Sequence, residues 1–197
     1  NEGNKKFIII GNMNCITYKE VFPLIKANKV WLGPPFPGGN AYFRPATQND
    51  YAAGVYDENT NLVKFRNCIW LTNVDHGRRH QPLQLMSMVD NLRFHKKLKG
   101  QSKYYHYDNY DAIEVGVTAN IPEDYFDVMG VPITFLDKYN PDQFEILECH
   151  EPACSLEKWR LSNQKFKEYE SRQIYVNGVL CQKAYHRIFI RRKQSGN

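Results

Sequence analysis

The stretch KKFIIIG at residues 5–11 constrains the fold of this chain more than any other feature. It is a continuous apolar run that ends at a glycine, which is typical of a strand buried on both faces of a parallel sheet. A helix-like segment follows at residues 17–28, and strand-like segments follow at 29–33 and 62–73. Strand, helix, strand, long loop and strand make half of an open α/β sheet. The first part of the chain therefore predicts an α/β fold.

The segment 17–28 carries mixed helix signals. Thr17 and Glu20 have the spacing of a capping box, and an apolar stripe at helical spacing follows them. Pro23 removes one helical hydrogen bond, so it predicts a kink or a late helix start.

The helix and strand signals in the sequence become weaker after about residue 75. Residues 83–98 have helical periodicity and a basic end, and Asn177-Gly178 between apolar residues predicts a two-residue β-hairpin. In the last predicted strand Arg187 and Phe189 share one face, and Ile188 and Ile190 lie on the other. The basic and aromatic face has two interpretations. Either this face contacts a polyanion, or the strand is half-buried and its arginine stems cover the sheet. We favour the half-buried strand.

The net charge of +5 hides an uneven distribution. Residues 1–100 hold 14 Lys/Arg and 7 Asp/Glu, residues 101–157 hold 2 and 12, and residues 158–197 hold 10 and 2. If the partner is a polyanion, the two basic flanks must supply the contact surface, because the acidic middle would repel phosphates. The alternative is that these charges form ordinary solvated faces.

Composition sets the outer limits. A chain of 197 residues with 42% hydrophobic residues can build one sizeable core, or a core plus a smaller subdomain. No run approaches the roughly 18 apolar residues of a membrane span, and the N-terminus resembles no signal peptide. Five irregularly spaced cysteines suit reduced thiols better than a disulfide framework. We expect a cytoplasmic protein that does not enter a membrane.

Most chemical motifs are weak. ECHEPAC at residues 148–154 brings Cys149, His150 and Cys154 close together, but no second ligand pair at zinc-like spacing follows, so a metal site is disfavoured. Glycine-rich nucleotide cradles are absent from the sequence. NVDHGRRHQ at residues 73–81 is more informative, because Arg78 and Arg79 in a turn-rich loop are typical of a phosphate clamp or of guanine recognition.

Long blocks of the sequence together resemble one family. KKFIIIGNMNCITYKEVFPLIKANKVWLG, GGNAYF, VKFRNCIWLTN, YDNYDAIEV, MGVPITFLDKYNPDQFEIL and RIFIRRK closely resemble, in this order, the adenine-specific DNA methyltransferases of the EcoRI type. The resemblance runs from residue 5 to the end of the chain. It implies an enzyme that uses S-adenosylmethionine to methylate the exocyclic amino group of adenine in duplex DNA.

The resemblance also implies which part of the enzyme this is. KKFIIIGN looks like the fifth strand of a Rossmann-like class I methyltransferase sheet, and 29–33 and 62–73 look like the sixth and seventh. The seventh strand of such sheets runs antiparallel between the fifth and sixth, so 34–61 is expected to be a long connection. We therefore expect the C-terminal half of the catalytic sheet in residues 1–74. Residues 75–197 would form an α+β DNA target-recognition region with a C-terminal β-hairpin extension.

The cofactor turn and the Asn/Asp-Pro-Pro-Phe motif of the family precede the block that begins this chain. S-adenosylmethionine should therefore be bound mainly by a missing N-terminal part, and the chain alone should be inactive. That part would also cover the edge of the fifth strand, which is otherwise unpaired. GPPF at residues 33–36 is not that motif, because Gly33 offers no side-chain acceptor and follows the sixth strand. We expect GPPF and the following glycines to form a bend.

The predicted DNA contacts come from two parts of the chain. Asn12 and Asn14 follow the fifth strand at the sheet edge where ligands bind, although they equally suit a helix cap or turn. The basic candidates are Arg66, Arg78, Arg79, Lys96 and Lys97. We predict no catalytic residue, cofactor ligand or metal ligand within this chain. The alternative function is a free-standing, non-catalytic DNA- or RNA-binding module.

Overall fold

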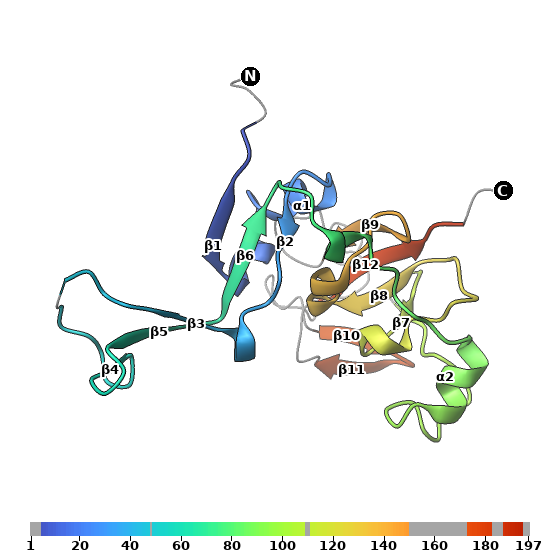
Figure 1. The fold of residues 1–197 in the computed structure, drawn as a ribbon. Helices are drawn as coiled ribbons and strands as arrows, with labels where there is room; N and C mark the ends of the chain where they lie inside the picture. Colours follow the sequence, from blue (N-terminus) through green and yellow to red (C-terminus); the bar gives the residue numbers. More distant parts are fainter. Residues whose placement is uncertain (1–4, 48, 109–110, 150–172, 183–186, 195–197) are drawn as a thin grey trace. The chain divides into compact units, whose positions relative to one another are not determined.

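The computed structural model describes residues 5–47, 49–108, 111–149, 173–182 and 187–194 (Figure 1). The chain is a mixed α/β protein with several small sheets. It divides into two compact units, Asn1–Arg78 and Arg79–Asn197. The assignment of residues 1–74 to a catalytic sheet and of 75–197 to target recognition stays a prediction.

The first sheet combines three segments that are distant in sequence. Its strands are β1 (Ile8–Asn12), β2 (Trp31–Leu32) and β6 (Cys68–Thr72), in the order β1-β6-β2 (Figure 1). Strand β6 is antiparallel to both neighbours, with Ile10 opposite Trp70 and Leu32 opposite Leu71. This is the order and direction expected of these segments. That they form half of a Rossmann-like sheet stays a prediction.

Strand β1 is more exposed than its sequence predicted. Ile8, Ile9 and Ile10 are 65%, 52% and 38% exposed, so the prediction of a strand buried on both faces is wrong for this chain. Successive side chains of a strand point to opposite faces, so this exposure shows that both faces of β1 are uncovered; β1 is also the edge strand of this sheet. The three consecutive isoleucines therefore expose apolar surface on both faces of β1. Sequence periodicity alone could not reveal this exposure.

Helix α1 (Phe22–Lys26) is only five residues long. Pro23 lies in its first turn, where its missing N–H costs nothing, and this confirms the predicted late start. The capping box was a wrong prediction, because Thr17 ends a preceding 3-10 helix, η1 (Met13–Thr17), and Val21 is the N-cap. Phe22 and Ile25 are buried and anchor α1 to the first unit.

The GPPF segment is a tightly packed exit from β2. The Gly33 N–H donates to the Trp70 carbonyl at 2.9 Å, and Phe36 stacks on the Trp70 ring at 4.9 Å between centroids. A β-carbon at Gly33 would lie 2.7 Å from the Trp70 Cβ. The segment then turns through η2 (Pro37–Gly39), where Gly38 has a φ of 61°. Gly33 is therefore needed for close packing of the backbone against Trp70.

The connection after β2 contains a second sheet that the sequence did not predict. Strands β3 (Asn40–Phe43), β4 (Tyr56–Asp57) and β5 (Leu62–Arg66) pair antiparallel in the order β3-β5-β4. The segment 62–73 is thus two strands and not one. It divides at Asn67, whose φ of 54° is a left-handed conformation that breaks an extended strand.

The second unit is built on a sheet with the order β7-β8-β12-β9. Its strands are β7 (Ile113–Glu114), β8 (Met129–Pro132), β9 (Phe144–Cys149) and β12 (Arg187–Arg192). Strand β12 lies between β8 and β9, and all four residues from Arg187 to Ile190 are buried. The predicted half-buried last strand, with arginine stems on the surface, is therefore wrong at Arg187.

Arg187 is buried because it has a buried partner. Its Nη2 donates to Glu114 Oε1 at 2.7 Å and its Nε donates to Glu114 Oε2 at 3.1 Å. The Tyr107 hydroxyl donates a short hydrogen bond to the same carboxylate. These side chains tie β7, β12 and the loop before β7 together inside the core.

The remaining elements of the second unit are short. Helix α2 (Met88–Phe94) begins at Ser87, whose Oγ accepts from the Asp90 N–H, so the predicted helix at 83–98 is shorter at both ends. The unit also contains the 3-10 helices η4 (Thr118–Asn120) and η5 (Ile133–Lys138). The hairpin of β10 (Gln173–Val176) and β11 (Val179–Gln182) is confirmed. Its turn residues have φ values of 51° and 73°, as a type I′ turn requires.

Buried tyrosines should make the second unit sensitive to alkaline pH. Burial and the Glu114 charge raise the pKa of Tyr107 well above its ordinary value, and burial also raises the pKa of Tyr104. The resulting stabilisation is complete below about pH 10 and is lost as the pH rises further, by up to about 1.4 kcal/mol per unit for a fully buried group. We expect tyrosinate absorbance and loss of circular dichroism to rise together above this pH.

Tyr107→Phe should flatten this pH dependence, whereas Tyr105→Phe, at a partly exposed neighbouring position, should leave it unchanged. Ionisation of every tyrosine in a unit that stays folded would contradict the prediction.

Among the described residues, no helix combines the length and apolar character needed to cross a bilayer. The ECHEPAC cluster cannot be placed as a whole, because residues 150–154 lie outside the described residues. Within the described ranges, no group of His, Cys, Asp and Glu is arranged to hold a metal ion.

Candidate nucleic-acid interface

Asn12 has a structural role at the end of β1. Its Oδ1 accepts from the Asn14 N–H at 2.9 Å, so it is the N-cap of η1. The alternative prediction, that this asparagine caps the following helix, is therefore confirmed for Oδ1 of Asn12. Both asparagine side chains are nevertheless exposed at the end of the strand. A contact of Asn12 or Asn14 with DNA stays a prediction.

The structure brings Arg66 to the same part of the first unit as Asn12. Asn12 is opposite Cys68 in the β1–β6 ladder, and the Met13 N–H donates to the Asn67 carbonyl at 2.6 Å. Arg66 immediately precedes this contact, at the exposed end of β5. Two predicted contact sites that are more than fifty residues apart in the sequence thus lie at one junction.

From this junction the β3–β5 pair presents a basic and aromatic face. Asn40 is opposite Arg66, and Tyr42 is opposite Lys64, so all four side chains lie on the same face. The Lys64 ammonium lies 5.9 Å from the centroid of the Tyr42 ring, which is 53% exposed. Sequence reasoning missed Tyr42 and Lys64. The period-2 alternation of NAYF and LVKFR, had it been applied, would have indicated this shared face.

The opposite face of the same strands is apolar. Ala41 and Val63 are buried, and Phe43 and Phe65 meet edge to face at 5.7 Å between ring centroids. Antiparallel pairing places Ala41 opposite Phe65 and Phe43 opposite Val63, which fixes these four on one side. The sheet is thus polar on one face and apolar on the other.

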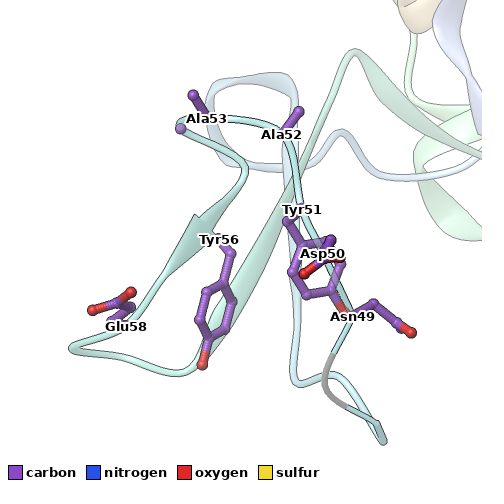
Figure 2. A pocket seen from close by; sticks show the side chains of 8 residues that line it. Asn49, Asp50, Tyr51, Ala52, Ala53, Tyr56 and Glu58 are labelled. Atoms are coloured by element: carbon purple, nitrogen blue, oxygen red, sulfur yellow. The ribbon is translucent and has the colours of Figure 1, made fainter.

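Beyond β4 the character of the surface changes. A shallow hollow of about 670 Å³ is lined by residues that include Asp50, Tyr51, Tyr56 and Glu58 (Figure 2). The two tyrosine rings stack at 5.4 Å. In the adjoining turn, hydrogen bonds from the Thr60 hydroxyl and the Asn59 N–H lower the pKa of Asp57. This acidic end disfavours phosphate, so any polyanion contact belongs nearer Arg66.

Arg78 and Arg79 do not lie in an open loop. They belong to the 3-10 helix η3 (Gly77–His80), and both are only partly exposed. Burial raises the pKa of Tyr139, and the nearby charge of Arg79 partly offsets this effect. His80 lies 3.4 Å from Asp142. The predicted turn-rich loop is thus a short 3-10 helix at these residues, and a DNA contact through either arginine stays a prediction.

Lys96 and Lys97 are exposed in the turn after α2. The Lys97 N–H donates to His95 Nδ1 at 3.4 Å, which holds the turn close to the helix end. In the last turn of α2 the Arg93 guanidinium lies 5.0 Å from the centroid of the Phe94 ring, which is 63% exposed. The end of α2 is thus a second basic and aromatic surface, in the second unit.

The described glycines at the sheet do not fit S-adenosylmethionine. A β-carbon at Gly11 would lie 3.4 Å from Cys15 Sγ, and one at Gly33 would meet Trp70 at 2.7 Å. Both backbones are therefore packed against side chains of this chain, without the open space that a glycine turn needs for a cofactor. Which residues hold most of the cofactor stays a prediction.

The chain is similar to one family model and to several curated proteins. A family model described as adenine-specific methyltransferase EcoRI matches residues 1–193. The type II methyltransferase M.EcoRI of Escherichia coli is 47% identical over 148 residues, which are 74% of this chain and 43% of that protein. The type II methyltransferase M.MgeORF184P of Mycoplasma genitalium is 30% identical over 201 residues, which are 97% of this chain and 58% of that protein.

The type II methyltransferase M.MpnI of Mycoplasma pneumoniae is 28% identical, over 98% of this chain and 59% of its own length. No solved structure matches the chain. The chain spans about half the length of the curated relatives that it matches.

Proposed function

Because this chain belongs to the family of DNA methyltransferases described as adenine-specific methyltransferase EcoRI, we propose that it is the DNA-recognition part of such an enzyme. The intact protein would transfer a methyl group to the exocyclic amino group of adenine in a specific duplex DNA site. The observation that carries the proposal is the family match over residues 1–193, together with 47% identity to a type II methyltransferase. S-adenosylmethionine, when bound, supplies the methyl group.

Two features of the first unit support the proposal that its three-stranded sheet is part of a larger sheet in the intact enzyme. Strand β6 runs antiparallel between β1 and β2, as expected of the last strands of such a sheet. Ile8 to Ile10 expose their side chains along β1, whose outer edge has no partner among the described strands. Further strands of the intact enzyme would pair with this edge, and covering helices would bury the isoleucines.

In this proposal the chain binds and orients DNA and does not carry out the chemistry. Asn12, Asn14 and Arg66 would contact the duplex from the junction at the end of β1. Arg78, Arg79, Lys96 and Lys97 would add basic contacts, chiefly from the second unit. Cations bind phosphates without regard to sequence, so they would fix position, while contacts with base edges would provide specificity.

Methyl transfer by two proteins tests the proposal: the 197-residue chain and the full reading frame that contains it. With labelled S-adenosylmethionine and duplex DNA, the full-length protein should form N6-methyladenine. The 197-residue chain should bind the duplex but transfer no methyl group above background, because it lacks both the cofactor turn and the side-chain acceptor. A denatured sample of the full-length protein is the background control.

Each result has a distinct meaning. Methylation by the 197-residue chain alone, or tight binding of S-adenosylmethionine by it, would overturn the division of labour. Methylated cytosine in place of adenine would overturn the substrate. A full-length protein that binds DNA but never methylates it would instead support the non-catalytic binding module.

A further inference from the structure

The β3-β5-β4 sheet lies within the connection between β2 and β6, and on its basic face Tyr42 and Arg66 are exposed. Both ends of the inserted segment join the first sheet, at Gly33 and at Asn67. In Figure 1 the strands β3 and β5 run outward from that sheet as a two-stranded ribbon that ends at β4. We call these strands and their turns the ribbon.

Buried side chains and a hydrogen bond within the ribbon hold its strands and turn in place. Ala41 and Val63 are 1% and 3% exposed, and the Tyr56 hydroxyl donates to Asn61 at 2.9 Å in the turn between β4 and β5. Asn61 has a φ of 53°, which closes this turn tightly. The side chains on the ribbon faces are therefore held at fixed spacing.

Charge on the ribbon is graded along its length. Lys64 and Arg66 lie on one face next to the junction, whereas the exposed Arg44, which follows Phe43, lies toward the β4 end. In the described part of the first unit, neither Lys64 nor Arg66 is ion-paired with a carboxylate. Asp57 and Glu58 lie at the other end. A polyanion is therefore attracted to the junction end of this face and repelled from the far end.

We propose that the face of the ribbon formed by Asn40, Tyr42, Lys64 and Arg66 is a docking surface for the phosphate backbone of duplex DNA. Lys64 and Arg66 would each neutralise a phosphate, and Tyr42 would donate its hydroxyl hydrogen bond or pack against a sugar. A two-stranded β-ribbon is narrow enough to enter the major groove or to follow its rim. This inference deepens the proposed function, on which it rests.

The composition of the face favours DNA over a protein partner. The apolar side chains that a protein interface would use, Phe43 and Phe65, are on the opposite face. The exposed Asn12 and Asn14, which are also expected to contact DNA, lie at the adjoining junction. One duplex could therefore contact the junction and the ribbon together.

Fluorescence anisotropy of a labelled duplex, titrated with the 197-residue chain, tests this surface. The double variant K64Q/R66Q should bind on the order of tenfold or more weakly at about 0.1 M salt. The slope of log affinity against log salt should fall by about 1.8, at roughly 0.9 per phosphate contact. K19Q/K29Q removes the same charge from exposed positions of the same unit, and it should change affinity by about twofold or less. Circular dichroism checks that both variants are folded.

Several outcomes would overturn the proposal. These are equal losses in the two double variants, a wild-type chain that does not bind the duplex, or single-stranded DNA or RNA that competes better than duplex DNA. In the full-length enzyme K64Q/R66Q should raise the KM for DNA and leave binding of S-adenosylmethionine unchanged. If the variant methylates DNA with an unchanged KM, the ribbon proposal fails and the proposed function stands. If the wild-type enzyme does not methylate DNA, the proposed function itself fails.

Discussion

Replacing Arg187 with Met should lower the free energy of unfolding of the second unit by about 3–5 kcal/mol, because it leaves a buried carboxylate without its cation. The Glu114 side chain is 6% exposed and accepts hydrogen bonds from two nitrogens of Arg187. The Tyr107 hydroxyl would still donate to this carboxylate, but it carries no positive charge. Since β12 lies between β8 and β9, the loss should affect the whole sheet. Urea unfolding measures the change, and amide exchange in β8 and β12 localises it.

Arg191 provides a matched control on the same strand. It pairs with Glu145 at 3.6 Å, and both side chains are about half exposed. Arg191→Met should therefore cost about 1 kcal/mol or less. The triple variant Y107F/E114L/R187M should recover much of the lost stability, because it removes the buried charges together. If Arg187→Met costs no more than Arg191→Met, the pair contributes little and the prediction is wrong.

Replacing Gly33 with Ala should destabilise the first unit by about 1–3 kcal/mol or more, because the added methyl group has no room. Its β-carbon would lie 2.7 Å from the Trp70 Cβ, an atom next to the backbone that cannot rotate away. The strand pair would have to separate, which would weaken the hydrogen bond from Gly33 to the Trp70 carbonyl and the stacking of Phe36 on Trp70. The urea midpoint and amide exchange of β2 and β6 measure the effect.

Gly77→Ala is the control for this substitution. Gly77 is in the same unit, no atom lies within 4 Å of the position that the added methyl group would take, and its φ is not in the left-handed range. Its replacement should leave the urea midpoint unchanged or slightly raise it, since alanine restricts the unfolded chain more than glycine does. Equal losses at the two positions would show that backbone freedom, and not crowding at Trp70, explains the effect.

Strong local signals in the sequence predicted local structure well. Asn177-Gly178 predicted its hairpin because a type I′ turn needs two positive φ angles, which these residues adopt most readily. Pro23 predicted a kink or a late helix start because proline lacks an amide hydrogen, and α1 starts late. The resemblance of long blocks to one family predicted the order β1-β6-β2, which no periodicity could give.

Other predictions failed where distant residues decide the outcome. Arg187 looked like a surface residue on a half-buried strand, but a glutamate 73 residues away makes its burial possible. Arg78 and Arg79 were predicted in a turn-rich loop, but they lie in a 3-10 helix and are only partly exposed. The segment 62–73 looked like one strand, since nothing in its apolar pattern shows that Asn67 turns the chain from one sheet to another.

The sequence by itself determined the family, the turns and the segments able to form strands, because these depend on residue identity and on neighbours along the chain. Only the tertiary structure decided which strands pair, that β1 is left exposed, and that Tyr42, Lys64 and Arg66 share one face next to Asn12. The physical reason is that register and burial arise from contacts between residues far apart in the chain. A local pattern limits these contacts but does not select among them.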